Sequence, residues 1–236
     1  MPHGQVERLA TLKRTANALL DAALDLIYPP GCVRCGAPGR YLCAECLAQA
    51  PLVTEAKHIT WSQGGRPARL PIWSVGLHEG VLREAVHALK YEGVRAASRQ
   101  MGQMLAEVWQ RQRPTAGSII AVPLHPRRQK ERGYNQSWLL AKALAVQVGV
   151  PASETNLERV RHTPAQVGLS AKERLSNVRG AFLAHGLSPG QRVVIVDDVC
   201  TSGATVVACA EALALAGADP VAAITFTRVA EPVRPD

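Results

Sequence analysis

The sequence predicts an α/β protein with a doubly wound parallel sheet, preceded by a small cysteine-bearing module and a helix. From Pro71 onward, short apolar runs alternate with amphipathic stretches, a pattern typical of strands alternating with helices. Two C-x-x-C motifs lie close together nearer the N-terminus. The chain has 236 residues, of which 47% are hydrophobic and 19% charged, so one sizeable core is expected and disordered or low-complexity classes are excluded.

Neither a membrane span nor a secretory signal is predicted. The sequence lacks a run of about 18 uncharged apolar residues, the minimum for a transmembrane helix. The first apolar stretch, from Ala16, is interrupted by Asp21 and Asp25 and has no cleavage-site pattern. We therefore expect a cytoplasmic protein with no membrane span, in which close cysteine pairs bind metal more often than they form disulfides.

The N-terminal part is expected to hold a helix and then the cysteine module. Residues 5–27 carry apolar side chains at helical spacing, and Pro29 and Pro30 end that pattern. The stretch SQGGRPAR (62–69) indicates a connection or an irregular loop. The expected divisions are an amphipathic helix at 1–27, the cysteine module at 28–60 and the α/β domain at 71–236.

The α/β domain is expected to alternate between the two kinds of element. Its apolar runs predict strands at 71–77, 118–124, 192–198 and 220–229. Stretches with apolar residues three and four apart predict helices at 81–90, 97–111, 137–149 and 205–217. Parallel strands covered on both faces follow from this order, and ligands of such sheets bind beyond the carboxyl ends of the strands.

The sequence GCVRCGAPGRYLCAECL predicts a structural metal site. Two C-x-x-C pairs can offer four thiolates to one tetrahedral zinc ion, which closes its shell and leaves no open position for catalysis. Removal of zinc is expected to unfold this module and leave the α/β domain folded. A redox pair or four free thiols is the alternative. The predicted ligands are Cys32, Cys35, Cys43 and Cys46.

The stretch RVVIVDDVCTSGAT (192–205) predicts a phosphate site. An apolar strand ends in Asp197 and Asp198 and is followed by a small-residue loop that enters a helix. Backbone N–H groups of residues 201–205 would converge at that helix N-terminus, where a phosphate is favoured. The two carboxylates suit ribose hydroxyls or a magnesium ion reached through water. The alternative is an N-capped turn with two solvated aspartates.

A basic excess lies in the middle of the chain. The formal net charge is +8, and residues 61–186 contain 18 Lys and Arg against 8 Asp and Glu. The segment 118–145 starts as a strand, turns at Pro123 and is expected to carry Arg127 and Arg128 on a loop facing a polyphosphate. A solvated arginine-rich face is the alternative. Because only 4% of residues are aromatic, a surface of stacked aromatic platforms has few residues available.

Three of these segments resemble parts of known enzymes. The stretch 192–205 resembles the phosphoribosyl-pyrophosphate (PRPP) motif of type I phosphoribosyltransferases. The V-P-x-x-x-x-R pattern at 122–128 is similar to the pyrophosphate loop of glutamine-dependent PRPP amidotransferases, and 159–182 to their flexible loop. This resemblance implies PRPP contacts from Asp197, Asp198, Thr201, Ser202, Gly203, Ala204, Thr205, Pro123 and Arg174, with catalytic roles for Asp197, Asp198, Arg127 and Arg128.

The order of motifs along residues 28–229 resembles the ComF family of bacterial competence-related proteins. The resemblance implies a double zinc ribbon, a phosphoribosyltransferase domain of type I fold, and PRPP with magnesium as ligand. Through the motif ALKYEGVR (88–95) it implies a phosphate contact from Lys90, for which a lysine at a helix C-terminus, favoured by the helix dipole, is the alternative. It also implies a role in DNA uptake during natural transformation, with single-stranded DNA and other competence or DNA-processing proteins as partners. The alternative function is non-catalytic binding of single-stranded DNA by the zinc ribbon and the basic face. No acceptor pocket is evident, so enzymatic turnover stays open.

Overall fold

The computed structural model describes residues 30–63, 66–161 and 177–230. Its main sheet has six strands in the order β1-β2-β8-β7-β3-β4, in which only β1 is antiparallel to its neighbour. The strands of this sheet are β1 (Lys57–Gln63), β2 (Arg66–Leu77), β3 (Ser118–Ala121), β4 (Ala152–Ser153), β7 (Arg192–Cys200) and β8 (Asp219–Arg228). A separate antiparallel pair is formed by β5 (Leu157–Arg159) and β6 (Phe182–Ala184).

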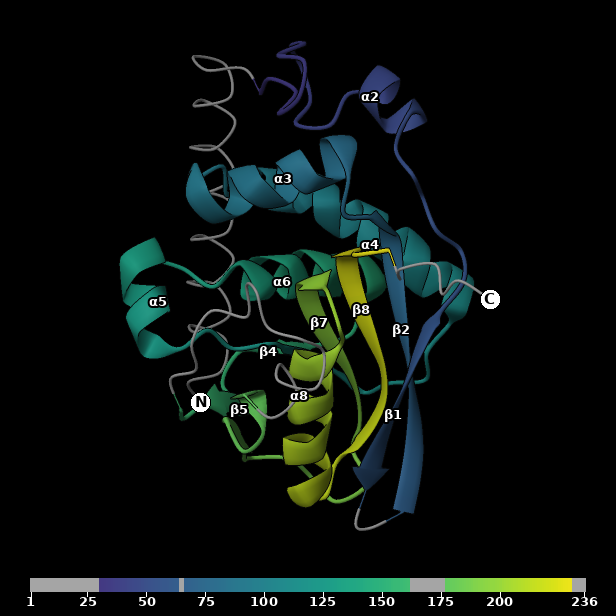
Figure 1. Ribbon diagram of the computed structural model, residues 1–236, viewed down its shortest axis with the longest axis vertical. Helices are drawn as coiled ribbons and strands as arrows, with labels where there is room; N and C mark the ends of the chain where they lie inside the picture. Colours follow the sequence, from purple (N-terminus) through teal and green to yellow (C-terminus); the bar gives the residue numbers. More distant parts are fainter. Residues whose placement is uncertain (1–29, 64–65, 162–176, 231–236) are drawn as a thin grey trace, which may run out of the picture.

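Helices cover both faces of the sheet, which confirms the predicted α/β class with a mostly parallel sheet (Figure 1). The helices of the described residues are α2 (Ala44–Ala48), α3 (Gly80–Tyr91), α4 (Ala97–Gln112), α5 (Pro126–Arg132), α6 (Gln136–Val148) and α8 (Ala204–Leu215). None of them is long and apolar enough to cross a membrane. The predicted helix at 5–27 lies outside the described residues.

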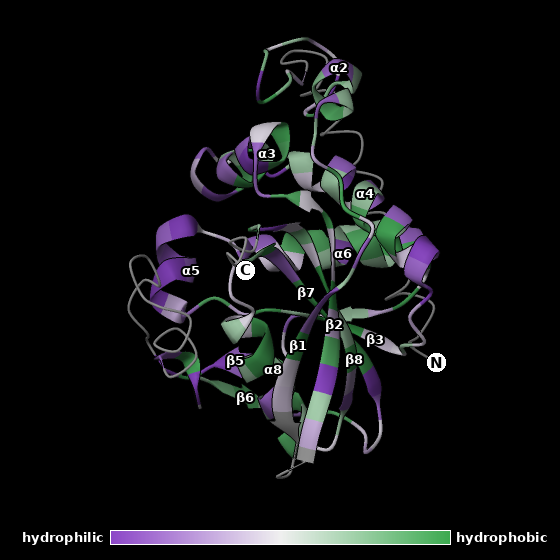
Figure 2. Ribbon diagram, turned by 45° about the vertical axis from the view of Figure 1, so that its right-hand side comes forward, coloured by the Kyte–Doolittle hydropathy of each residue, from purple (hydrophilic) through white to green (hydrophobic). Residues whose placement is uncertain are grey.

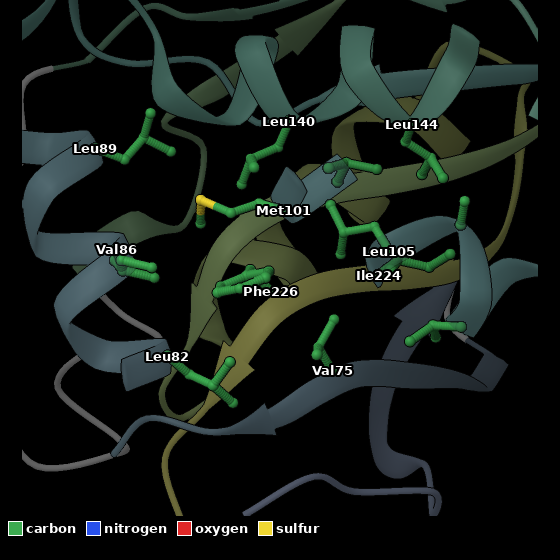
Figure 3. Packing of buried hydrophobic residues seen from close by; sticks show 14 of the residues in the cluster. Val75, Leu82, Val86, Leu89, Met101, Leu105, Leu140, Leu144, Ile224 and Phe226 are labelled. Atoms are coloured by element: carbon green, nitrogen blue, oxygen red, sulfur yellow. The ribbon is translucent and has the colours of Figure 1, made fainter. Parts of the chain in front are cut away.

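Alternate residues of the central strands belong to two hydrophobic cores, one on each face of the sheet. Val194 and Val196 of β7 belong to the core under α3, α4 and α6, whereas Val193 and Ile195 belong to the core under α8. Figure 3 shows the first core from close by, with Phe226 among side chains of α3, α4 and α6. Because both faces are buried, the central strands are mainly apolar, as expected for a parallel sheet, apart from Asp197 and Asp198 of β7 and the buried threonines of β8.

The cysteine module is packed on α3 and α4 and shares their core. Leu42 has no exposed surface and lies in the same cluster as Leu82 and Met101. The Gln100 side chain of α4 accepts a hydrogen bond from the Leu42 N–H (3.0 Å) and donates one to the Leu42 carbonyl (2.6 Å). Figure 1 shows the module at the top of the molecule, next to α3.

The structure corrects two local predictions. Residues 62–63 and 66–69 lie in strands and not in an irregular loop, because β1 and β2 pair antiparallel as far as Gln63 and Arg66. The segment after Pro123 forms helix α5, where a loop was expected. Pro126 occupies the first turn of α5 and Gly133 ends it with a φ of 79°. The basic residues of this segment therefore lie on a short helix, which is mostly hydrophilic in Figure 2.

Candidate functional site

Two adjacent buried carboxylates occupy the carboxyl-terminal part of β7. Asp197 and Asp198 are 8% and 4% exposed. Asp197 Oδ1 accepts a hydrogen bond from Ser137 Oγ (2.7 Å) and another from the Asp198 N–H (2.9 Å). Ser137 lies in the first turn of α6, so the start of that helix positions the acid pair.

Lys90 of α3 is the cation that faces this pair. Its Nζ lies 2.5 Å from Asp198 Oδ2, and the side chain is 19% exposed. Burial alone would lower the pKa of Lys90, but the charge and hydrogen bond of Asp198 and the charge of Asp197 raise the pKa above its ordinary value. Lys90 therefore stays charged. The last turn of α3 thus brings a fixed positive charge to the end of β7.

The neighbours of Asp197 only partly offset the cost of burying its negative charge. Burial and the neighbouring Asp198 raise the pKa of Asp197 to about 7, although Ser137 and Lys90 oppose the shift. Within the described residues, two carboxylates face one ammonium group, which leaves room for a further positive charge. The donor set therefore fits a magnesium ion held through water, or hydroxyl groups that donate to the carboxylates.

The loop after β7 turns sharply into α8. Gly203 has a φ of 86°, and a Cβ at this position would lie 3.1 Å from Ile59 Cγ2. Lys57 Nζ donates to the Thr201 carbonyl (3.1 Å), and the Ala204 N–H donates to Ser202 Oγ (3.4 Å). Strand β1 thus holds the 201–205 loop in place through Lys57. Residues 201–205 are at the N-terminal end of a twelve-residue helix, where an anion is stabilised by the helix dipole.

The neighbouring strand β3 leads into the second predicted loop. The Val122 N–H donates to the Val196 carbonyl (2.9 Å), and Asn135 Nδ2 donates to the Val122 carbonyl (3.1 Å). Asn135 also caps α6 by accepting from the Ser137 N–H (3.0 Å). One buried side chain therefore holds the 122–123 backbone against the helix that orients Asp197.

Within the described residues, Lys90 and not Arg127 or Arg128 forms an ion pair with the two aspartates. Arg127 is 73% exposed and pairs with Glu131 on the same helix (3.2 Å). Arg128 acts on Arg159 of β5, whose pKa is lowered by burial and by that neighbouring charge and raised by Asp197. Arg159 therefore lies within electrostatic reach of both the basic helix and the acid pair. Arg174 lies outside the described residues.

A pocket of about 480 Å³ lies on the β4–β5 side of the 123–129 segment. Its wall combines Leu124, Gln129, Leu157, Arg159 and His185. Sequence reasoning missed Arg159 as a site residue, as it missed Ser137 and Asn135. The N-x-S pattern of an N-capped helix directly after the basic segment was the available signal for the last two.

The four predicted metal ligands converge at the other end of the molecule. The sulfur atoms of Cys32, Cys35, Cys43 and Cys46 lie within 4.8 Å of one another, and those of Cys35 and Cys43 are 3.6 Å apart. A tetrahedral ion with bonds of about 2.3 Å to sulfur places its ligands about 3.8 Å apart, so the cluster fits one metal ion.

Local backbone geometry favours deprotonation of Cys32, whereas burial and the neighbouring thiols raise the pKa of Cys46 to about 12. Burial alone would raise the pKa of Cys32, but N–H groups of Cys35, Cys43 and Arg34 directed at its sulfur lower the pKa to about 6. Cys43 caps helix α2 by accepting from the Cys46 N–H at 3.4 Å. Thiolates are the form that binds metal, so Cys32 is suited to metal binding.

The fold and the acid-pair site define a protein with a phosphoribosyltransferase domain, and the family comparison agrees. Residues 135–236 match the phosphoribosyl transferase domain family. The chain is 33% identical over 183 residues to competence protein F of Haemophilus influenzae, which covers 75% of each chain. It is 31% identical over 198 residues to the DNA utilization protein YhgH of Escherichia coli K12, covering 80% of each. The chain belongs to the ComF family.

Solved structures give weaker overall likenesses. The glutamine PRPP amidotransferase of B. subtilis, solved with ADP and GMP, is 28% identical, with a TM-score of 0.39 over 56% of this chain and 26% of that one. The adenine phosphoribosyltransferase of Leishmania tarentolae is 14% identical, with a TM-score of 0.37 over 72% of this chain and 83% of that one.

Proposed function

We propose that the protein binds PRPP with magnesium at the carboxyl ends of β7 and β3 and acts as a ComF-type phosphoribosyltransferase-like protein in DNA uptake. The observation that carries the proposal is the buried Asp197–Asp198 pair facing Lys90, directly before the 201–205 turn into α8. The competence and DNA utilization names of the relatives support the biological role.

Each part of PRPP has a complementary region. The 5′-phosphate would accept from N–H groups of the 201–205 turn. The ribose hydroxyls would donate to Asp197 and Asp198, and magnesium, when bound, would neutralise charge that grows on the departing pyrophosphate. The pyrophosphate would lie toward the 122–128 segment, with Lys90, Arg128 and Arg159 within the same positive field.

Calorimetry with PRPP and magnesium tests this proposal. The Asp197→Asn, Asp198→Asn double variant should lose measurable PRPP binding, because it removes both charges that hold the ribose and the ion. Asp219→Asn is the matched control, since Asp219 is exposed and its ion pair within the described residues is with Arg192 at 3.7 Å. The proposal fails if wild type does not bind PRPP, or if the double variant binds as well as the control.

The four-cysteine cluster is proposed to hold structural zinc. Four thiols with no position left for water match the ligand set that zinc favours in structural sites. Bound zinc would supply folding energy to a segment too short to bury a core of its own. Metal analysis of the purified protein should find one zinc ion per chain, lost when Cys35 is replaced.

One surface supports single-stranded DNA as a second ligand. Tyr91 is 68% exposed, and the Arg132 guanidinium lies over its ring, 5.3 Å from the centroid. Next to it, Arg95 lies 4.2 Å from the centroid of the Tyr134 ring, and the Tyr134 hydroxyl donates to the Leu89 carbonyl. The fold thus gathers two tyrosines of an aromatic-poor chain beside basic helix α5, which suits base stacking combined with phosphate contacts.

Fluorescence anisotropy with a labelled single-stranded oligothymidine tests this surface. Tyr91→Ala should weaken binding by about 5- to 100-fold, the range expected for one stacked base, and Tyr91→Phe should keep the wild-type affinity. Affinity should also fall steeply with salt, and the salt slope should become shallower in Arg132→Gln. Equal binding by Tyr91→Ala and Tyr91→Phe would remove this surface as the DNA site.

A further inference from the structure

The order of the strands limits where an acceptor substrate can approach. Pyrophosphate at the 122–128 segment would lie on the β3 side of the acid pair, because β3 and β7 are neighbours in the sheet. A nucleophile that replaces pyrophosphate at the ribose carbon approaches from the opposite side. In this sheet the opposite neighbours of β7 are β8 and then β2. The acceptor therefore approaches over the carboxyl ends of β8 and β2.

One histidine stands at that edge. His78 directly follows β2, and its N–H donates to the Arg228 carbonyl at the end of β8 (2.7 Å). Its Nδ1 lies 2.8 Å from Thr227 Oγ1 of β8, and Thr227 Oγ1 in turn donates to the Asp198 carbonyl (3.4 Å). His78 is thus joined to the acid pair through a single threonine.

One tautomer of this histidine satisfies both contacts of Thr227 Oγ1. A threonine hydroxyl has one proton, and Thr227 gives it to the Asp198 carbonyl. The contact between Thr227 Oγ1 and His78 Nδ1 therefore needs the proton on Nδ1, which leaves the lone pair on Nε2. Within the described part of the chain, Nε2 has no hydrogen-bond partner.

The surrounding charges keep the imidazole neutral. Burial lowers the pKa of His78, and the charges of Lys90 and Arg83 lower it further, while Asp198 acts in the opposite direction. The ring is half-buried, so a small molecule can reach its edge. A neutral imidazole with an open Nε2 is the form that accepts a proton.

We infer that His78 is the proton acceptor for an acceptor substrate with an N–H nucleophile, an amine or a nitrogen heterocycle, which adds a reaction partner to the proposed PRPP site on which this inference rests. The bond between the ribose carbon and the pyrophosphate oxygen breaks, and its electron pair leaves with pyrophosphate. The bond from nitrogen to that carbon forms, and the proton released from nitrogen goes to Nε2 of His78. Thr227 is a positioning residue that fixes the tautomer.

A comparison of two nucleophiles distinguishes proton transfer to His78 from the other steps of the reaction. Hydroxylamine carries an N–H proton that it must lose after attack, whereas azide has none. Pyrophosphate release from PRPP is measured with each nucleophile in wild type, His78→Asn and the control His58→Gln, which changes an exposed residue of β1. Asn keeps an N–H donor near the Nδ1 position and lacks a proton acceptor at Nε2.

The expected result is selective. His78→Asn should lower the hydroxylamine rate by about 10²- to 10⁴-fold, the usual contribution of a general base, and leave the azide rate unchanged. Thr227→Val should lower the hydroxylamine rate and alter its pH profile, and Thr227→Ser should restore both. The inference is overturned if wild type releases no pyrophosphate with hydroxylamine, or if His78→Asn lowers both rates equally or neither. Calorimetry separates this failure from that of the proposed function, which is the absence of PRPP binding by wild type.

Discussion

Lys90 Nζ and Asp198 Oδ2 meet at 2.5 Å and join the last turn of α3 to the end of β7. Both side chains are mostly removed from water, so the contact combines a desolvation cost with strong Coulombic attraction. Any cation that binds the acid pair competes with Lys90 for Asp198. A ligand that brings both magnesium and phosphates offers each partner a replacement, since Lys90 can then turn to a phosphate.

Loss of Lys90 alone should strongly destabilise the protein. Lys90→Met leaves Asp198 buried without its partner, and we expect the free energy of unfolding to fall by about 3–5 kcal/mol in urea titrations. The double variant Lys90→Met, Asp198→Asn should regain a large part of this loss, because the unpaired charge is gone. If the single variant is as stable as wild type, the ion pair contributes nothing to the fold.

Asp197 should make stability fall as pH rises toward neutrality. Its pKa is raised from an ordinary value of 3.8 to about 7, so between these values the folded state holds a proton that the unfolded chain has lost. The free energy of unfolding therefore decreases with rising pH across this window. Asp197→Asn removes the contribution and should stabilise the protein more at pH 8 than at pH 5. Asp219→Asn, changed at the surface, should show no such difference in parallel unfolding curves.

Removal of the metal should loosen α3 and α4 as well as the cysteine module. Leu42 and Cys46 belong to the core of those helices, so unfolding of the module uncovers their apolar faces. Hydrogen exchange should accelerate at 80–91 and 97–112, and remain slow in β3 and β7, after treatment with a chelator.

Cys35→Ala provides the clean version of this experiment. Cys35 is the exposed member of the cluster, so its replacement removes a ligand without opening a cavity. The variant should exchange like the chelated wild type and respond no further to chelator. Exchange that accelerates only at 30–50 would instead match the simpler expectation that the module unfolds alone.

Gly203→Ala should impair the phosphate turn beyond its effect on stability. The position has a φ of 86°, and the methyl group of an alanine there would lie 3.1 Å from Ile59, so the loop must shift. Gly190→Ala is the matched control, because Gly190 has a φ of 71° with open space around it. Both variants should lose about 1 kcal/mol in unfolding free energy, but only Gly203→Ala should weaken calorimetric binding of ribose 5-phosphate.

Local sequence patterns were sufficient to predict most helices and strands. Helix α4 was expected at 97–111 and spans Ala97–Gln112, because its apolar spacing alone determines which face is buried. The hairpin was missed because the glycines and the proline of the stretch 62–69 indicated a connection or an irregular loop. Pro67 precedes Ile72, where pairing of β2 with β8 begins, so it lies in the part of β2 that is bonded only to β1.

The candidate site also contains parts that the sequence could predict and parts that it could not. Asp197, Asp198 and the 201–205 turn were predicted from one continuous motif, and so were the four cysteines. Contacts between segments distant in the sequence, such as Ser137 with Asp197 or His78 with Thr227, depend on strand order and helix placement, which no single stretch contains. The roles of Arg127, Arg128 and Arg174 stay predictions.

The two edge strands of the main sheet differ in length, and neither favours pairing with a strand of another chain. Strand β4 has only two residues, so it presents few unpaired backbone groups. The longer edge strand, β1, carries Lys57, exposed His58 and exposed Thr60. Short strands and polar edge residues oppose strand addition between molecules. Addition of a strand from another molecule at these two edges should therefore be disfavoured even at high protein concentration.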